Sequence, residues 1–270
     1  MNLSNLTIVI ITYNRYCYLS RLISFYQSYH DDLNIIVLDS SSDKTLDKNL
    51  LAKLKSKNVV WQKYESSIFF VDKIALGSQF IKTEYAVLCA DDDFLFPETL
   101  KKAVQFLFKH QDYSSCLGLQ YKHHKISFLS KKFLIFRESA IGGEKVSEDS
   151  SSKRIFKYLS GRSVYYPIYA VHSTNNFKKI WQESSNLVSD WGLSEVFPSA
   201  YSLSIGKMMV LKFPYITRER NSYTWYDDRR LKQMYSADKV EKVQNRLTQI
   251  ICKFDSIEYS DSEKVVKNSI

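Results

Sequence analysis

The stretch 85–97, YAVLCADDDFLFP, decides how the chain is read. Its first six residues are almost wholly apolar, which is typical of a strand buried on both faces. Asp91, Asp92 and Asp93 follow directly, and Pro97 suits the first position of a helix. Because adjacent carboxylates repel one another, a fold keeps three together only where something offsets their charge, as a divalent cation does. A solvated turn that caps the helix is the alternative, but the end of a buried strand favours a metal site.

Strand and helix patterns alternate outward from that stretch. The runs 6–12 (LTIVIIT) and 34–39 (NIIVLD) are continuous and rich in β-branched residues, as in strands buried on both faces. Between them, Asn14 fits the cap of a helix whose apolar residues recur at helical spacing. The other elements expected in this half are strands at 59–64 and 85–90 and helices at 46–54, 70–81 and 97–110. This order predicts an α/β fold with a mainly parallel sheet flanked by helices.

The second half of the chain is less regular. From about residue 225 onward it is polar with helical patterning, which indicates a helical C-terminal extension. Before that point we expect strands at 115–121, 126–136, 165–171 and 207–213, helices at 152–159, 174–183 and 193–203, and a polar loop over 137–152.

Three polar clusters stand where expected strands end, at 12–15 (TYNR), 39–42 (DSSS) and 91–93 (DDD). The ligand crevice of a parallel sheet lies beyond the carboxyl ends of its strands, so we expect the clusters to converge on one rim. The first strand–helix turn has no glycine, which argues against a dinucleotide-binding loop, and the chain has no P-loop motif.

Three stretches together resemble the family-2-like GT-A glycosyltransferases, which are inverting enzymes with a DxD motif: 7–15 (TIVIITYNR), 34–41 (NIIVLDSS) and 85–97. The resemblance implies a GT-A-like fold and transfer of a sugar from a nucleoside-diphosphate sugar to an acceptor hydroxyl, with inversion. By analogy, the product would be a surface polysaccharide or another glycoconjugate. The resemblance also implies a nucleotide-sugar-binding half at 1–112, an acceptor-binding half of the same domain at 113–224, and the helical extension at 225–270.

The resemblance assigns roles to residues of the rim. Asp39 would bind the base or the ribose, and Asp91 would contact the ribose. Many relatives carry an acid two places before the Asp pair, where this chain has Ala90, so which two of the three aspartates form the pair stays open. The nucleotide pocket would also be lined by Thr12, Tyr13, Asn14, Arg15, Ser41, Lys73 and Asp92, and Mn²⁺ or Mg²⁺ would be held by Asp91, Asp92, Asp93 and His172.

Several basic residues have two interpretations. Lys73 lies on a helix that relatives place near the nucleotide, and it is either a phosphate contact or a solvated lysine. Arg218 and Arg220 follow the last expected strand, where they could clamp a diphosphate or form a solvated turn.

Two acids compete for the role of catalytic base. In the family an acid opens a helix about eleven residues before a glycine that leads into the last strand, and counting back from Gly206 gives Glu195. Asp190 lies further upstream beside Trp191 and resembles the family's acid–aromatic pair. Each has a structural alternative, since aspartate favours helix caps and glutamate favours the first helical turn.

Two other classes of protein stay open. A nucleotidyltransferase shares much of this architecture, but it would resemble chains with a glycine-rich first loop, which is missing here. A catalytically inactive module that binds sugar nucleotides would keep the same motifs without turnover.

The composition of the chain limits the classes of binding partner and the cellular compartment that we expect for the protein. The net charge of +9 is spread over lysine pairs without an Arg-rich arm, so anionic lipid or a diphosphate ligand is favoured over nucleic acid. The four cysteines form no C-x-x-C pair, which argues against structural zinc. No apolar run approaches the roughly 20 residues of a membrane span. We therefore expect a cytoplasmic protein, peripheral at the inner face of the membrane, that acts on a glycan or lipid-linked acceptor.

Overall fold

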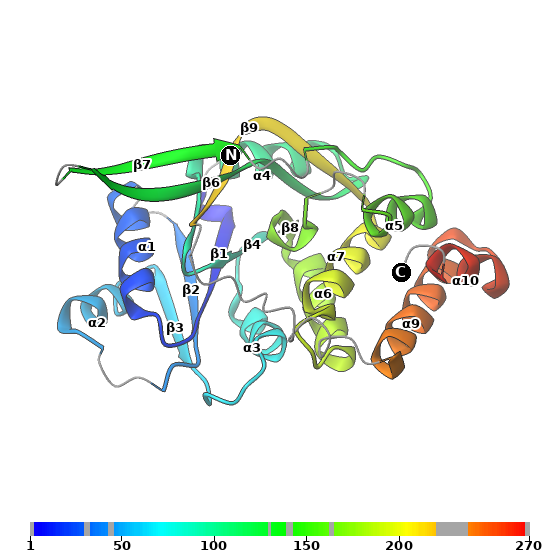
Figure 1. Ribbon diagram of the computed structural model, residues 1–270, viewed down its shortest axis with the longest axis horizontal. Coiled ribbons are helices and arrows are strands. Elements are labelled where there is room, and N and C mark those ends of the chain that lie inside the picture. Colours follow the sequence, from blue (N-terminus) through cyan, green and yellow to red (C-terminus); the bar gives the residue numbers. More distant parts are fainter. Residues whose placement is uncertain are drawn as a thin grey trace.

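A mixed sheet runs through the molecule, with helices on both sides (Figure 1). The computed structural model describes residues 3–29, 33–42, 46–128, 131–138, 143–161, 165–219 and 237–267. Within these ranges the sheet has nine strands in the order β3-β2-β1-β4-β8-β6-β9-β5, with β7 paired to β6.

The first half of the chain forms the parallel part of the sheet. Its strands are β1 (Leu6–Thr12), β2 (Asn34–Asp39), β3 (Val59–Lys63) and β4 (Tyr85–Ala90). β1 pairs in parallel with β2 and β4, and β2 pairs in parallel with β3. All four lie where their apolar runs predicted them, because strands covered by helices on both faces need continuous apolar sequence.

The second half adds antiparallel and long strands. The sequence predicted separate strands at 115–121 and 126–136, but the structure has one long strand, β6 (Tyr113–Phe128), followed by its antiparallel partner β7 (Lys131–Glu138). β9 (Lys207–Glu219) continues past residue 213 and pairs in parallel with β6. Strand β5 (Asp93–Leu95), which pairs with β9, was not predicted from the sequence.

The strand predicted at 165–171 is wrong. A short 3₁₀ helix, η3 (Pro167–Tyr169), occupies most of it, and strand β8 (Val171–Ser173) begins only where the predicted strand ends. Proline has no N–H to donate to a strand ladder, which explains why the apolar run around Pro167 does not pair.

Helix positions agree with the sequence pattern more closely. Side-chain caps begin several of them, as where Asp47 accepts from Leu50 N at 2.7 Å and Ser173 accepts from Asn176 N at 3.3 Å. The helices are η1 (Leu3–Asn5), α1 (Tyr16–Tyr29), α2 (Lys48–Leu54), α3 (Phe70–Gly77), η2 (Ser78–Phe80), α4 (Pro97–Lys109), α5 (Ser151–Leu159), α6 (Thr174–Leu187), α7 (Leu193–Ile205), α9 (Ala237–Asp255) and α10 (Tyr259–Lys267).

Alternate side chains of β1 enter two separate cores. Ile8 and Ile10 pack in the cluster that contains Leu22 of α1 and Leu100 of α4. Val9 packs in the cluster that contains buried residues of α3 and α6. Helices therefore cover both faces of the sheet, which confirms the α/β class that the sequence predicted.

A third core joins the C-terminal helices to the rest of the chain. In Figure 1, α9 lies beside α5 and α7. Leu247 and Ile251 of α9 are buried with Phe197 of α7 and Ile155 of α5. Of the helices described, none is both long enough and apolar enough to cross a bilayer.

We expect Gly118→Ala to destabilise the fold, because β6 and β9 approach closely there. A Cβ at residue 118 would lie 2.5 Å from the backbone oxygen of Phe213 and 3.0 Å from Cβ of Tyr215. Overpacking of this kind costs about 1–3 kcal/mol in the free energy of unfolding. Gly161→Asn is the control, since nothing lies within 4 Å of that position and asparagine tolerates its φ of 71°. Urea unfolding should show a clear loss for the first variant and little change for the control. Equal stabilities would contradict the expectation.

Candidate active site

The carboxyl ends of β1, β2 and β4 form one rim of the sheet. Thr12 at the end of β1 is in register with Asp39 at the end of β2. On its other side β1 pairs Ile11 with Ala90, the residue before Asp91. The three polar clusters of the sequence therefore lie next to one another, in the arrangement that a ligand crevice requires.

Asp91 and Asp92 share one arginine. Arg15 Nη2 donates to Asp91 Oδ1, and Arg15 Nη1 donates to Asp92 Oδ2 at 2.9 Å. Thr12 Oγ1 donates to Asp91 Oδ2 at 2.7 Å. The Asp91 side chain is fully buried, whereas 16% of the Asp92 side chain is exposed. Asp92 is thus the carboxylate of this pair that a ligand can reach.

Burial and charge act in opposite directions on this pair. Burial raises the pKa of Asp91 to about 6, although Arg15 and Thr12 both favour its ionised form. Burial alone would lower the pKa of Arg15, but the charges of Asp91 and Asp92 outweigh it and the pKa is raised. Arg15 therefore stays charged at any physiological pH and offsets the two acids.

Asp93 is paired from the other half of the chain. It opens β5 opposite Arg218 of β9, and Arg218 Nε lies 3.3 Å from Asp93 Oδ2. That buried oxygen has no hydrogen-bond partner among the described residues. Burial raises the pKa of Asp93 to about 7, against the attraction of Arg218 and with the help of the other two aspartates. A buried oxygen left in this state marks a position where a cation or another missing partner is expected.

A polar chain continues from Asp93 to the start of α7. The guanidinium of Arg218 lies over the ring of Tyr169, with Cζ 4.8 Å from the ring centre. Tyr169 donates its hydroxyl hydrogen to Glu195 Oε1 at 2.8 Å. Asp93 and Tyr169 raise the pKa of Arg218, and burial raises the pKa of Tyr169 well above its ordinary value. Arg218 therefore stays cationic and Tyr169 stays a donor, so that Glu195 is held in the network of the Asp cluster.

Asp190, the other candidate for the base, has a different setting. Its Oδ1 accepts from Leu193 N at 2.9 Å, the contact of a residue that caps the turn into α7. Its Oδ2 is buried and lacks a hydrogen-bond partner in the part of the chain that the structure describes. Glu195 is thus linked to the rim through Tyr169, whereas Asp190 caps the turn into α7. Which of the two acids is the catalytic base is a question for experiment.

Asp39 is held entirely by groups of the chain itself. Ser41 N donates to its Oδ1 at 2.8 Å, and its Oδ2 accepts from Tyr16 Oη at 3.0 Å, Lys63 Nζ at 3.1 Å and Trp61 Nε1 at 3.2 Å. Burial opposes ionisation, but the hydrogen bonds from Ser41 and the charge of Lys63 outweigh it and lower the pKa. The predicted contact of Asp39 with a base or ribose would have to replace one of these bonds.

Lys73 is buried rather than presented to a ligand. Its Nζ donates to Thr12 O at 2.9 Å and to Ser40 Oγ at 2.8 Å, and burial lowers its pKa to about 8. Neither interpretation made from the sequence describes this placement, because the side chain runs through the protein from α3 to the loops after β1 and β2. Lys73 fixes these two loops relative to each other.

The other predicted pocket residues connect the same two loops. Asn14 adopts a left-handed φ of 53°, and its N–H donates to Ser41 Oγ at 2.8 Å. Its side-chain oxygen accepts from Ser42 N at 2.9 Å, so it braces the loop instead of capping α1 as the sequence suggested. Tyr13 is half exposed beside it. The rim is therefore a rigid, cross-linked surface on which Tyr13 and Asp92 remain accessible.

His172, predicted as a third metal ligand, is not brought to the Asp cluster. It lies in β8, in register with Ala86 near the start of β4, whereas the aspartates follow the end of that strand. Five positions at about 3.3 Å each separate the two places by about 17 Å. The imidazole is buried, its Nε2 lies 2.8 Å from Pro167 O, and burial lowers its pKa to about 4. We correct the prediction accordingly and leave His172 out of the site.

A metal site can still be built at the rim. Within the described ranges, no group of three or more His, Cys, Asp and Glu side chains is arranged to hold an ion. Mg²⁺ usually takes one or two protein carboxylates and completes its shell with water and substrate phosphates. Asp92, which is accessible, and Asp93, which has an unsatisfied buried oxygen, fit that smaller requirement.

Sequence reasoning missed several residues that shape the site. Tyr16, Trp61 and Lys63 hold Asp39, and Tyr169 links Arg218 to Glu195. Tyr169 lies in the segment wrongly predicted as a strand, so no sequence signal placed it at the rim. Arg218 was identified, and it pairs with Asp93; Arg220 lies outside the described residues.

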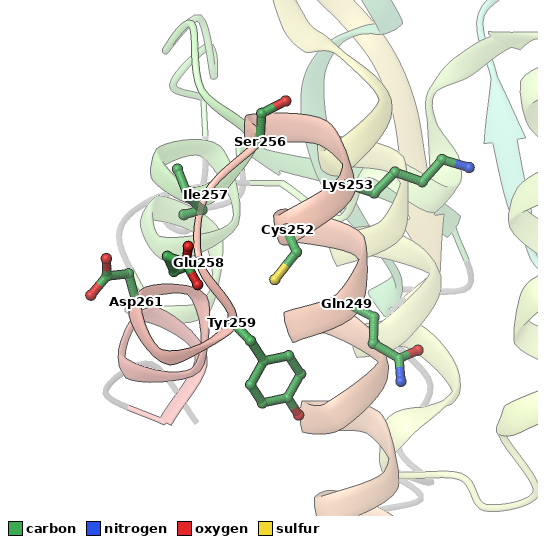
Figure 2. Close-up of a pocket in the computed structure, with 8 residues that line it drawn as sticks. All are labelled: Gln249, Cys252, Lys253, Ser256, Ile257, Glu258, Tyr259 and Asp261. Carbon is green, nitrogen blue, oxygen red and sulfur yellow. The ribbon is translucent and has the colours of Figure 1, made fainter.

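A hollow of ≈ 830 Å³ lies elsewhere, at the turn between α9 and α10 (Figure 2). Its lining includes Cys252, Tyr259 and Asp261 and none of the rim residues. Among the residues that the structure describes, acids, arginines and strand ends converge at the rim and not at this hollow.

The chain belongs to glycosyl transferase family 2, whose sequence profile matches residues 7–157. No curated protein matches it significantly in sequence. Among solved structures, S. aureus TarS 1-349 is similar, with a TM-score of 0.62 and 17% identity over 98% of this chain and 69% of that one.

Two further structures of the same protein carry ligands. TarS 1-349 in complex with UDP-GlcNAc has a TM-score of 0.62 and 16% identity over 99% of this chain and 71% of that one. The complex with UDP has a TM-score of 0.59 and 16% identity over 99% and 70%. At this identity the likeness shows a shared fold, and it agrees with the family assignment that the sequence motifs suggested.

We expect Lys63→Met to lower the free energy of unfolding at neutral pH by about 1–2 kcal/mol, because it removes a charged donor from buried Asp39. The loss is no larger because 43% of the Lys63 side chain is exposed and solvent screens its charge. The folded-state pKa of Asp39 is lowered, so the stabilisation is present above the unfolded pKa of about 3.9 and is lost as pH falls through the folded value. The difference should thus be constant from pH 5 to 8 and shrink below about pH 4. Urea unfolding across this range tests it, with exposed Lys57→Met as the control. A difference that grows toward acid would contradict the assignment.

Proposed function

We propose that the chain transfers a sugar from a nucleoside-diphosphate sugar to a hydroxyl of a glycan or lipid-linked acceptor, with inversion, in the assembly of surface polysaccharide or another glycoconjugate. The observation that carries the proposal is a pair of networks on adjacent aspartates: Asp91 and Asp92 bind Arg15, and Asp93 is linked through Arg218 and Tyr169 to Glu195. A charge-compensated acid cluster linked to a candidate base supports a diphosphate site and a catalytic base at this rim. UDP is the first nucleotide to test, since TarS 1-349 has been solved with UDP-GlcNAc and with UDP.

The donor would lie across the rim. Tyr13 is half exposed and could pack on the nucleotide, while Asp39, Asn14 and Lys73 hold the loops on which it sits. Arg15 and Arg218 have the planar, bidentate geometry that suits phosphate oxygens. A divalent cation bound by Asp92 and Asp93 would offset the charge of the departing diphosphate.

Chemistry would take place on the α7 side of that donor. An acceptor oxygen forms a bond to the anomeric carbon from the face opposite the diphosphate, while the bond from that carbon to the diphosphate oxygen breaks. The acceptor proton passes to a carboxylate at the start of α7, and the nucleoside diphosphate leaves with the electron pair of the broken bond. Glu195 and Asp190 are the two acids that we propose for this role.

Binding of UDP should need a divalent metal, and Asp93→Ala should remove most of that binding. The affinity should also rise from pH 5.5 to 8, because a cation binds ionised carboxylates and the pKa values of Asp91 and Asp93 are raised to about 6 and about 7. Calorimetry with Mn²⁺, with Mg²⁺ and in chelator measures these effects. Asp261→Ala, an exposed acid on α10, is the matched control. Equal affinity in metal and in chelator would reject the metal site while leaving glycosyl transfer to be tested separately.

Changing the base should stop turnover and leave the donor bound. Glu195→Gln and Asp190→Asn are compared, and the true base should lose about 10²- to 10⁴-fold in rate with unchanged affinity for UDP. Glu183→Gln, which alters an acid of α6 paired with Arg246, controls for the substitution itself.

The products of the same assay separate the classes of protein. A transferase releases a nucleoside diphosphate and a nucleotidyltransferase releases pyrophosphate, whereas an inactive module binds nucleotide without turnover. If both variants keep near-normal rates, a carboxylate base on α7 is excluded.

A further inference from the structure

An aromatic cluster lies where α3 and α7 begin, formed by Phe69, Phe70 and Trp191. Trp191 stacks on Phe70 with ring centres 5.1 Å apart and an angle of 25° between the planes. Phe69 meets the same indole edge-on at 5.4 Å and 85°. Although two rings pack against it, Trp191 keeps 63% of its surface exposed. A large part of the indole therefore faces solvent.

The cluster adjoins the rim through two routes along the chain. Phe70 is one helical turn before Lys73, whose Nζ reaches Thr12 and Ser40 behind the strand ends. Trp191 directly follows Asp190 and lies about one turn before Glu195, the two acids proposed for the base. The indole therefore lies close along the chain to both acids.

The backbone around Trp191 is fixed. Ser194 donates its hydroxyl hydrogen to Trp191 O at 2.7 Å, and Leu193 N donates to Asp190 Oδ1 at 2.9 Å. The indole is thus held in place before any ligand arrives, and little conformational freedom is lost when a partner covers it.

We propose that Trp191 is the stacking platform for a pyranose ring of the acceptor, in a subsite next to the reacting hydroxyl; this rests on the function proposed above. The face of an aromatic ring carries negative charge and attracts the C–H groups on the flat side of a sugar ring. The acceptor is therefore a glycan that presents a ring, not only an alkyl chain.

Binding of defined glycans tests the platform without knowledge of the natural acceptor. The probes are cellotetraose and chitotetraose. Their binding is measured by saturation-transfer NMR with UDP and Mg²⁺ present. Wild-type protein should bind at least one probe, with the strongest saturation on the ring C–H groups. Trp191→Leu, which keeps apolar volume but no aromatic face, should weaken binding about tenfold, equivalent to about 1.4 kcal/mol. Trp191→Phe should retain most of the affinity, and Phe108→Leu, an exposed aromatic on α4, should change nothing.

Several outcomes would overturn the platform. The first is that the wild-type protein binds neither ring probe, and the second is that folded Trp191→Leu keeps its affinity for the probes. The third is an equal loss of affinity in the Leu and Phe variants. The fourth is a fall in UDP affinity when Trp191 is replaced, which would place the indole on the donor side. Circular dichroism confirms folding of each variant. The two proposals fail separately: a chain that binds glycans through Trp191 but neither binds nor turns over a sugar nucleotide would refute the proposed function and keep the platform.

Discussion

Compensation of three adjacent carboxylates is the constraint on which the site depends. Asp91 and Asp93 are buried, and their raised pKa values show how strongly burial opposes their charge. Arg15, from the loop after the first strand, and Arg218, from the last strand, supply the opposite charge from two sides. Without both arginines the end of β4 would hold mutually repelling buried acids, an arrangement that costs several kcal/mol.

This constraint explains why the two halves of the fold are inseparable. β5 carries Asp93 and is only three residues long, yet it pairs with β9, which in turn runs beside β6. The pairing brings Arg218 over Tyr169, and Tyr169 reaches Glu195 on α7. The Asp cluster and the start of α7 are therefore linked through Arg218 and Tyr169.

The strands of the parallel half of the fold could be predicted from the sequence alone, for a physical reason. Strands such as 6–12 and 34–39 are buried on both faces and must be apolar without interruption, which is a strong local signal. Their ends placed Thr12, Asp39 and Asp91 correctly on one rim. The family resemblance drew on the same stretches, and the match over residues 7–157 agrees with it.

The rest depended on long-range pairing that leaves little local trace. The residues Asp93–Leu95 show no local strand pattern, since the strand with which they pair, β9, lies far along the chain. Pro167 turned an apolar run into a 3₁₀ turn, so Tyr169 could not be placed. The prediction for His172 was wrong because β8 pairs with the start of β4, whereas the aspartates follow the end of that strand. The buried position of Lys73 was not predicted, because its neighbours in sequence do not distinguish a lysine that crosses the interior from a surface lysine.

The position of Arg218 in β9 has a consequence for synthesis of the protein. Ribosomes deliver the aspartates early and this arginine much later, after β6, α6 and α7 have been made. Until β9 docks, Asp93 lacks its guanidinium and β5 lacks its pairing strand, so a nascent chain carries the acid cluster of the rim without its second arginine. The rim is therefore completed only after β6, α6 and α7 have been made.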